Sequence, residues 1–291
     1  MKPSVGDKLF YAINYAVLSA VGLLCLLPMV HIAALSLSEA HAVQAGLVAF
    51  WPVSWSLEAY TSLIAGTDIV RAFQNNVVLT TVGTGLSMIF TVLAAYPLSR
   101  RDMHGRRLLT LAIVFTMLFS GGIIPNYLLI KSLGLINSYG AIWFPALVSV
   151  FNMLVLKTYF ESLPVEMEEA AQIDGCGEWR MLSRIVLPLS LPVLTAIALF
   201  YAVGFWNQFM TVLLYMHDTT KYNLTVLVQM MVQNQSFLQE LNNLQPEDAA
   251  KLAPATIKSA GVIVLLMPML VIYPFLQKYF IKGVLVGAIK G

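Results

Sequence analysis

The chain has 291 residues, of which 58% are hydrophobic and 11% are charged, and its mean hydropathy is +0.77. A soluble globular domain carries roughly twice that charged fraction, so the composition excludes an ordinary soluble protein and indicates a membrane protein. The net charge of +2 says little by itself, because in a membrane protein the positions of the charges matter more than their sum.

About six apolar segments are near the roughly 20 residues that a helix needs to cross a bilayer. In chain order they cover 10–37, 73–98, 108–130, 139–160, 192–215 and 260–280. No segment of about 10 residues alternates apolar and polar side chains as a barrel strand does, so we predict an all-α, polytopic helical bundle. The first segment is far longer than the ~7–15 residues of a signal peptide core, which predicts a retained anchor.

Lysine and arginine predict the orientation. With the amino terminus inside, twelve basic residues lie on the inner side and five on the outer side, and RRDMHGRR (100–107) is the densest cluster. The excess of positive charge marks the cytoplasmic side. We therefore expect both termini, and the polar segment 164–190, to be cytoplasmic.

Two longer connections are expected on the outer side. Residues 38–70 hold Trp51, Trp55 and Tyr60, an aromatic cluster suited to the headgroup interface. Residues 217–257 are rich in Asn and Gln, which are side chains that can meet a polyhydroxylated ligand or a docked partner. A solvated loop with an amphipathic helix is the plainer interpretation, and the sequence leaves both open.

The most informative segment is the polar interruption at 164–190. Pro164 starts a helix whose first turns carry acidic residues, which suits the positive end of the helix macrodipole. Gly175 then stops the helix, because glycine adopts left-handed angles without steric cost. A second, amphipathic helix is expected at about 178–187, with Pro188 and Pro192 marking re-entry into the membrane. Periodicity alone allows either docking into a cytoplasmic partner or a helix lying on lipid headgroups.

The residues of this segment resemble the EAA signature of ABC-importer permeases. The resemblance rests on Glu169-Ala170-Ala171, Asp174-Gly175 and the IVLPL run at 185–189. WSLEAY (55–60), SGGIIPNYLL (120–129) and the tail KGVLVGAIKG (282–291) agree with the carbohydrate-uptake branch, so the likeness covers nearly the whole chain. It is similar to the oligosaccharide permeases, including the second permease subunits of alginate importers.

That resemblance implies a type I importer permease with a MetI-like fold. Residues 1–70 would form an amino-terminal transmembrane helix with an outer segment, and 71–291 the core domain with its coupling helix at 164–190. Glu169 would contact a separate ATPase subunit, Ala170 and Ala171 would allow close packing, and Asp174 and Gly175 would form the turn. The implied partners are a second permease, an ATPase dimer that binds ATP and Mg, an extracytoplasmic solute-binding protein, an oligosaccharide and membrane lipid, with no nucleic acid.

We expect the chain itself to be no enzyme and to bind no cofactor or metal. It contains no GxxxxGK[ST] loop, and its four histidines and two cysteines follow no metal-ligand spacing. The alternative function is an ion-coupled secondary sugar carrier, which usually needs carboxylates inside the membrane. All fifteen Asp and Glu residues fall at span ends or in loops, which argues against proton coupling.

Polar side chains inside the spans are the candidates for a translocation path, because such groups tend to face a bundle interior or a water-filled cavity. An aromatic face can stack on a pyranose while amides bind its hydroxyls, so Trp206 with its two neighbours is the most sugar-like group. Hydrogen bonding between helices is the plainer role for these residues. The candidates are Asn75, Asn76, Asn126, Asn152, Trp206, Asn207 and Gln208.

Overall fold

A computed structural model describes residues 5–119, 121–173, 175–233 and 254–288. Its secondary structure is helical, and within those ranges the only β-type pairing is an isolated bridge between Ser38 and Trp55, so the all-α prediction is confirmed. The chain forms two compact units: Met1–Val70 with Leu227–Met267, and Arg71–Val226 with Pro268–Gly291. The domain division predicted from sequence stays a prediction. Within the outer connection 217–257, residues 234–253, which carry most of its Asn and Gln, lie outside the described residues.

The first unit contains one long, exposed helix and a small core in which side-chain hydrogen bonds connect neighbouring segments. Its elements are α1 (Val5–Ser36), α2 (Ala40–Gln44), α3 (Glu58–Gly66) and the first part of α17 (Pro254–Ala288). The most apolar window of α1 has no buried residue. At its end, Ser36 and Tyr60 share a hydrogen bond of 2.9 Å between their hydroxyls, and Ser38 Oγ donates to the Ala34 carbonyl at 2.7 Å.

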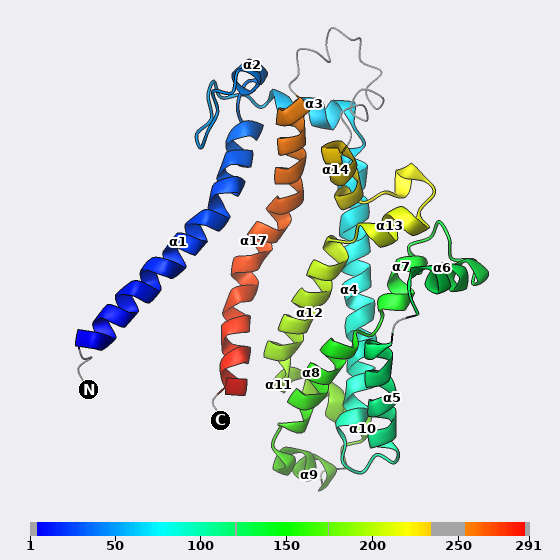
Figure 1. The fold of residues 1–291 in the computed structure, drawn as a ribbon. Coiled ribbons are helices and arrows are strands. Elements are labelled where there is room, and N and C mark those ends of the chain that lie inside the picture. The colour runs from blue at the N-terminus through cyan, green and yellow to red at the C-terminus, as the bar shows by residue number, and fades with distance from the viewer. Residues whose placement is uncertain (1–4, 120, 174, 234–253, 289–291) are drawn as a thin grey trace. The chain divides into compact units, whose positions relative to one another are not determined.

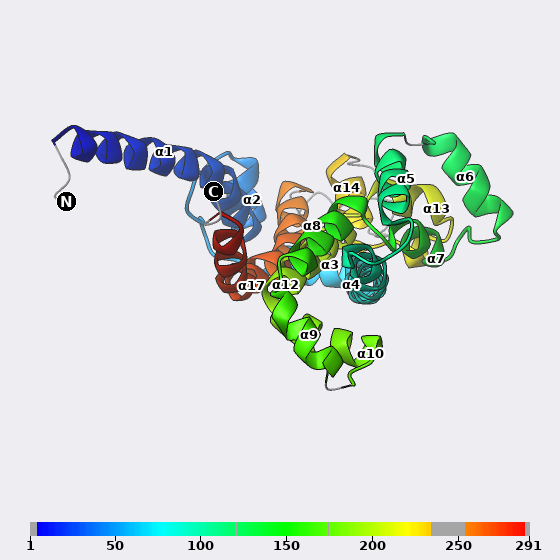
Figure 2. The ribbon, with the colours of Figure 1, turned by 90° about the horizontal axis from the view of Figure 1, so that it is seen from below.

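The second unit is built around α4 (Figure 1). It comprises α4 (Ile69–Ser99), α5 (Arg106–Leu118), α6 (Ile123–Ser132), α7 (Gly140–Trp143), α8 (Val150–Glu161), α9 (Val165–Ile173), α10 (Glu178–Met181), α11 (Leu187–Leu189), α12 (Leu191–Trp206), α13 (Met210–Tyr215) and the start of α14 (Leu224–Gln233). Figure 2 looks along α4 and shows α9 and α10 to one side of it. A hydrogen bond of 2.6 Å between the Thr91 and Tyr201 hydroxyls joins α4 to α12 inside the bundle.

Length and composition allow up to six membrane spans in the described chain, as predicted. Three single helices qualify, at Gly6–Ser36, Ile69–Ser99 and Pro254–Ile272, and three bent helix pairs make up the rest. The bent pairs differ from the straight helices that the sequence predicts for the third, fourth and fifth segments. Hydropathy measures how apolar a segment is, but it does not record where the backbone turns.

The third predicted span, 108–130, is a bent helix pair in the structure. The axes of α5 and α6 differ by 113°. Phe119 is extended, and Gly122, with φ of +85°, occupies the N-cap of α6. A positive φ cannot be part of a right-handed helix, so the chain must turn there. With 13 residues, α5 spans about 20 Å, which is short of the full hydrocarbon thickness.

The fourth segment is bent as well, because Gly140–Ala146 and Val150–Glu161 meet at 43°. The last bent pair, Glu178–Leu189 and Leu191–Trp206 at 83°, has its break just before the predicted fifth segment, 192–215. The fifth helix ends at Trp206 instead of running on to 215, because Asn207 caps it by donating from Nδ2 to the Val203 carbonyl at 2.9 Å.

The chain bends between Pro188 and Pro192, the two prolines that the sequence predicts to mark re-entry into the membrane. Pro188 lies within α11, and the bend comes at Ser190. A π-helix at Leu182–Val186 precedes it, which fits the loss of one backbone N–H at a proline.

Candidate functional site

The segment 164–190, hereafter the hinged segment, has its turn where the sequence predicts it. Glu166 and Glu168 lie in the first turn of α9, at the positive end of its macrodipole. Gly175 has φ of +73°, and the Cys176 N–H donates to the Ala171 carbonyl at 2.9 Å. This six-to-one hydrogen bond is that of a Schellman motif, which ends a helix on a left-handed residue. The direction of the segment after α9 is therefore fixed by its backbone.

Both halves of the hinged segment are attached to the last turn of α4. Arg100 forms an ion pair with Glu168 of α9, and the Tyr96 hydroxyl donates to Glu178 Oε2 of α10 at 2.7 Å. The Arg100 guanidinium also lies 4.3 Å above the centroid of the Tyr96 ring, so the two attachments share one stack. Both α9 and α10 therefore contact the carboxyl end of α4, one through Tyr96 in its last turn and the other through Arg100 directly after it.

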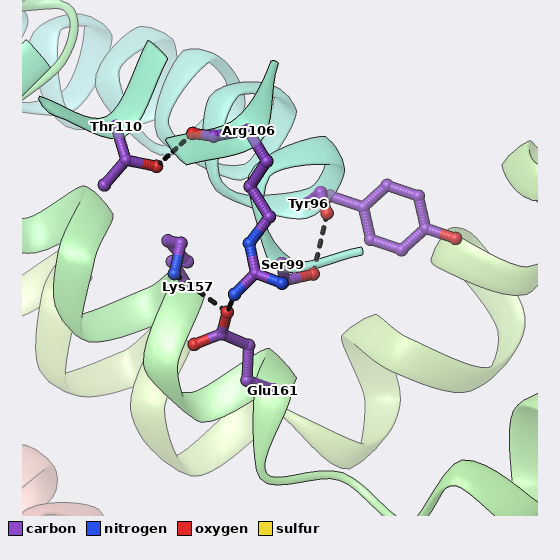
Figure 3. A network of polar contacts seen from close by, with 6 residues as sticks. All are labelled: Tyr96, Ser99, Arg106, Thr110, Lys157 and Glu161. Atoms are coloured by element: carbon purple, nitrogen blue, oxygen red, sulfur yellow. Dashed lines mark hydrogen bonds and ion pairs between the residues drawn. The ribbon is translucent and has the colours of Figure 1, made fainter. Parts of the chain in front are cut away.

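A second network joins α8 to α5 (Figure 3). Lys157 Nζ donates to Glu161 Oε1 at 2.8 Å, and Arg106 forms an ion pair with the same oxygen. Arg106 is the first residue of α5, where the macrodipole disfavours a cation, so the Glu161 carboxylate offsets an unfavourable position. The Tyr96 ring meets the Phe160 ring edge-on at 6.3 Å, which connects this network to the end of α4.

Two large apolar side chains of the hinged segment, one on α9 and one on α10, are uncovered. Ile173 is 86% exposed and Trp179 is 74% exposed, although both are large hydrophobic side chains. Glu169 is exposed beside a cavity of about 300 Å³, whereas Ala171 is buried within the chain. Asp174 and the side chain of Ala170 lie outside the described residues. Exposed apolar side chains of this size mark an interaction surface.

A second candidate site is a pocket of about 280 Å³ inside the bundle, between the start of α8 and the end of α12. It brings together two of the predicted path residues, Asn152 and Gln208, with the rings of Phe200 and Phe205. The Tyr201 hydroxyl also lines it, held in place because it accepts from the Ser149 N–H at 2.8 Å. Amides beside aromatic rings suit a sugar, whose hydroxyls and apolar ring face need both.

Trp206 lies outside that pocket and is buried. Its ring meets Phe73 edge-on at 6.0 Å, and its carbonyl accepts from Thr225 Oγ1 at 2.8 Å and from Asn76 Nδ2 at 3.4 Å. Asn76 is also fully buried, and its Oδ1 has no hydrogen-bond partner among the residues that the structure describes. In this conformation neither side chain is presented to a ligand.

The other predicted path residues are spread through the unit. Asn75 donates from Nδ2 to the carbonyls of Thr220 and Tyr222, at 2.8 and 2.9 Å, and so fixes the loop before α14. Asn126 is exposed on α6, and Asn207 is the exposed cap of α12. Hydrogen bonds from Thr220 in the same loop lower the pKa of the exposed Asp218 carboxyl.

Three functional side chains were missed by sequence reasoning. Tyr201 is the only tyrosine within α12, and a hydroxyl in an apolar helix is a signal that could have found it. Arg100 and Glu168 were counted only as charges, since their pairing joins residues 68 positions apart. No periodicity within either helix encodes such a contact.

Comparison with known proteins agrees with these features. The family described as "Binding-protein-dependent transport system inner membrane component" matches residues 78–286. The chain is 41% identical to the polygalacturonan/rhamnogalacturonan transport system permease protein YtcP of Bacillus subtilis, covering 98% of this chain and 99% of the relative. It is 40% identical to protein LplC of the same organism, over 100% and 98%.

A solved structure shares the fold. It is a crystal structure of a bacterial ABC transporter involved in the import of the acidic polysaccharide alginate. One of its chains matches with a TM-score of 0.87 and 29% identity, covering 96% of this chain and 99% of that one. The predicted resemblance is thereby confirmed, and the chain belongs to the family of binding-protein-dependent transport system inner membrane components.

Proposed function

We propose that this chain is the transmembrane permease subunit of an ABC importer that carries an oligosaccharide, such as a fragment of alginate or of another polysaccharide, across the cytoplasmic membrane. The observation that carries the proposal is family membership over 78–286, together with relatives that carry polygalacturonan/rhamnogalacturonan and alginate. The alternative of an ion-coupled secondary carrier has no such support. Both termini and the hinged segment face the cytoplasm in this proposal, as the distribution of lysine and arginine indicates.

The hinged segment is the coupling element. The ATPase subunits bind ATP and Mg, since this chain has no phosphate-binding loop, and α9 docks on them through its uncovered face. Ile173 and Trp179 are the apolar side chains available for that contact, with Glu169 at its polar edge. The ion pair of Arg100 with Glu168 then carries displacement of α9 to the end of α4.

The sugar path runs past the pocket at the end of α12. Gln208 supplies hydrogen bonds to sugar hydroxyls and the exposed Phe200 ring supplies an apolar face, with Asn152 lining the pocket from a buried position. The residues that line this pocket carry no charge, so selection of an acidic sugar would fall to the second permease or to the solute-binding protein.

The experiment is reconstitution with the second permease, the ATPase pair and the solute-binding protein in liposomes. We expect uptake of labelled oligosaccharides and sugar-stimulated ATP hydrolysis only with all four components present. Uptake driven by an ion gradient without the ATPase would refute the proposal.

Variants of the pocket test the sugar path separately. In Asn152→Ala and Gln208→Ala we expect the KM of uptake to rise roughly two- to tenfold each, since each removes about 0.5–1.5 kcal/mol of hydrogen bonding. The matched control is Asn207→Ala, because that amide caps α12 and does not line the pocket. Equal effects in all three variants would exclude the pocket as the path.

A further inference from the structure

We propose that a basic cavity at the start of α5 binds the headgroup of an anionic phospholipid. The cavity has a volume of about 820 Å³ and lies between the 101–107 loop, the first turns of α5 and the end of α8. Its lining includes the cations Arg101, Arg106, Arg107 and Lys157, and the apolar side chains Leu108 and Leu111. This proposal is independent of the sugar that the importer carries.

The charges around the cavity are not balanced by the protein. Glu161 pairs with both Arg106 and Lys157, as Figure 3 shows for the three side chains. Among the described residues, Arg101 and Arg107 form no ion pair. The four cations of this cavity thus have one carboxylate beside them, Glu161, which leaves an excess of positive charge that attracts an anionic group.

The nearest further carboxylates belong to a neighbouring cavity. Asp102, Glu168, Glu169 and Glu178 line that cavity of about 300 Å³ together with Arg100, and Arg101 borders both cavities. Glu168 is engaged by Arg100 and Glu178 accepts from Tyr96. Arg107 lines only the basic cavity of the two, so it is the cation least affected by these carboxylates.

The apolar wall identifies the anion as part of a lipid. Leu108 is 73% exposed and Leu111 is 58% exposed, and α5 as a whole has no buried residue. The same helix continues with Phe115 and Leu118, which are 58% and 70% exposed. A cationic site that opens onto a stretch of uncovered apolar helix matches an amphiphile with a charged head and acyl chains. A free phosphate ion would make no use of the leucines.

The test is the lipid selectivity of the assembled transporter in nanodiscs, measured with spin-labelled phosphatidylglycerol against spin-labelled phosphatidylcholine. The test variant is Arg101→Gln with Arg107→Gln. The matched control is Arg180→Gln with Arg184→Gln, because this exposed pair lies on the hinged segment outside the cavity. We expect the preference for phosphatidylglycerol to fall roughly fivefold for each arginine removed at the cavity. The control should keep the preference.

Three results would overturn the proposal. The first is an unchanged preference in the cavity variant, and the second is an equal loss in the control. The third is displacement of the labelled lipid by glycerol phosphate at equimolar concentration, since that would identify a site for a soluble anion. If the cavity variant loses co-purified ATPase subunits but keeps its lipid preference, the surface is a protein contact and the lipid site does not exist.

Discussion

The ion pair of Arg100 with Glu168 offers the sharpest test of how the hinged segment acts on the bundle. Both side chains are partly buried, at 17% and 21% exposure. Exposed ion pairs contribute about 0.2–1 kcal/mol, whereas breaking a buried pair costs about 3–5 kcal/mol, so we assign this contact about 1–2 kcal/mol. That free energy corresponds to a factor of about 5–30 in the equilibrium between attached and detached α9.

The perturbation is a double-mutant cycle of Arg100→Gln and Glu168→Gln in the assembled transporter. The measured quantity is the ratio of ATPase activity with sugar-loaded binding protein to activity without it. We expect either single variant to lower this ratio several-fold and the double variant to be no worse than the more severe single one, because the second substitution removes a contact already lost. Glu166→Gln is the control, since Glu166 is exposed on the same helix and forms no ion pair among the described residues.

Additive effects in the double variant would refute the reasoning, because they would mean that the two side chains act independently. An equal loss in Glu166→Gln would do the same, since it would trace the effect to the charge of α9 and not to its attachment. The amount of each variant in the membrane fraction is measured as well, so that a loss of coupling can be distinguished from a loss of the protein itself.

Two further predictions concern glycines. In Gly175→Val a side chain must adopt φ near +73°, at a cost of about 1–2 kcal/mol, so we expect sugar-stimulated ATPase activity to fall, whereas Gly177→Val, with ordinary φ of −74°, should retain it. In Gly83→Val the new Cβ would lie 2.9 Å from the Phe205 ring. We therefore expect the free energy of unfolding to fall by about 1–3 kcal/mol, measured as a lower unfolding temperature of the purified protein. Gly85→Val, which meets nothing within 4 Å, should leave the unfolding temperature unchanged, and a shift as large as that of Gly83→Val would contradict the packing argument.

What the sequence predicts well is what local chemistry decides. The turn at Gly175 is an example, because glycine takes the φ of +73° that ends α9 without the steric cost that another residue would have. The bend before Gly122 was missed because the flanking residues are apolar on both sides, and a hydropathy window averages across the turn. Trp206 was expected to contact a sugar, but its ring packs edge-on against the ring of Phe73, which lies 133 positions earlier in the chain. Contacts of that range are set by packing and leave no pattern within a single helix.

The sharp bend at Ser190 makes the helical segment before it, residues 178–189, project sideways from α12. Residues 178–189 project at 83° from the axis of α12, and twelve residues of helix extend about 18 Å. Because residues 178–189 lie nearly at a right angle to α12, a rotation of α12 about its own axis by about 10° would displace residue 178 by about 3 Å over that length. Rotation of α12 about its axis, and not only its translation, can therefore be coupled to a protein that binds residues 178–189.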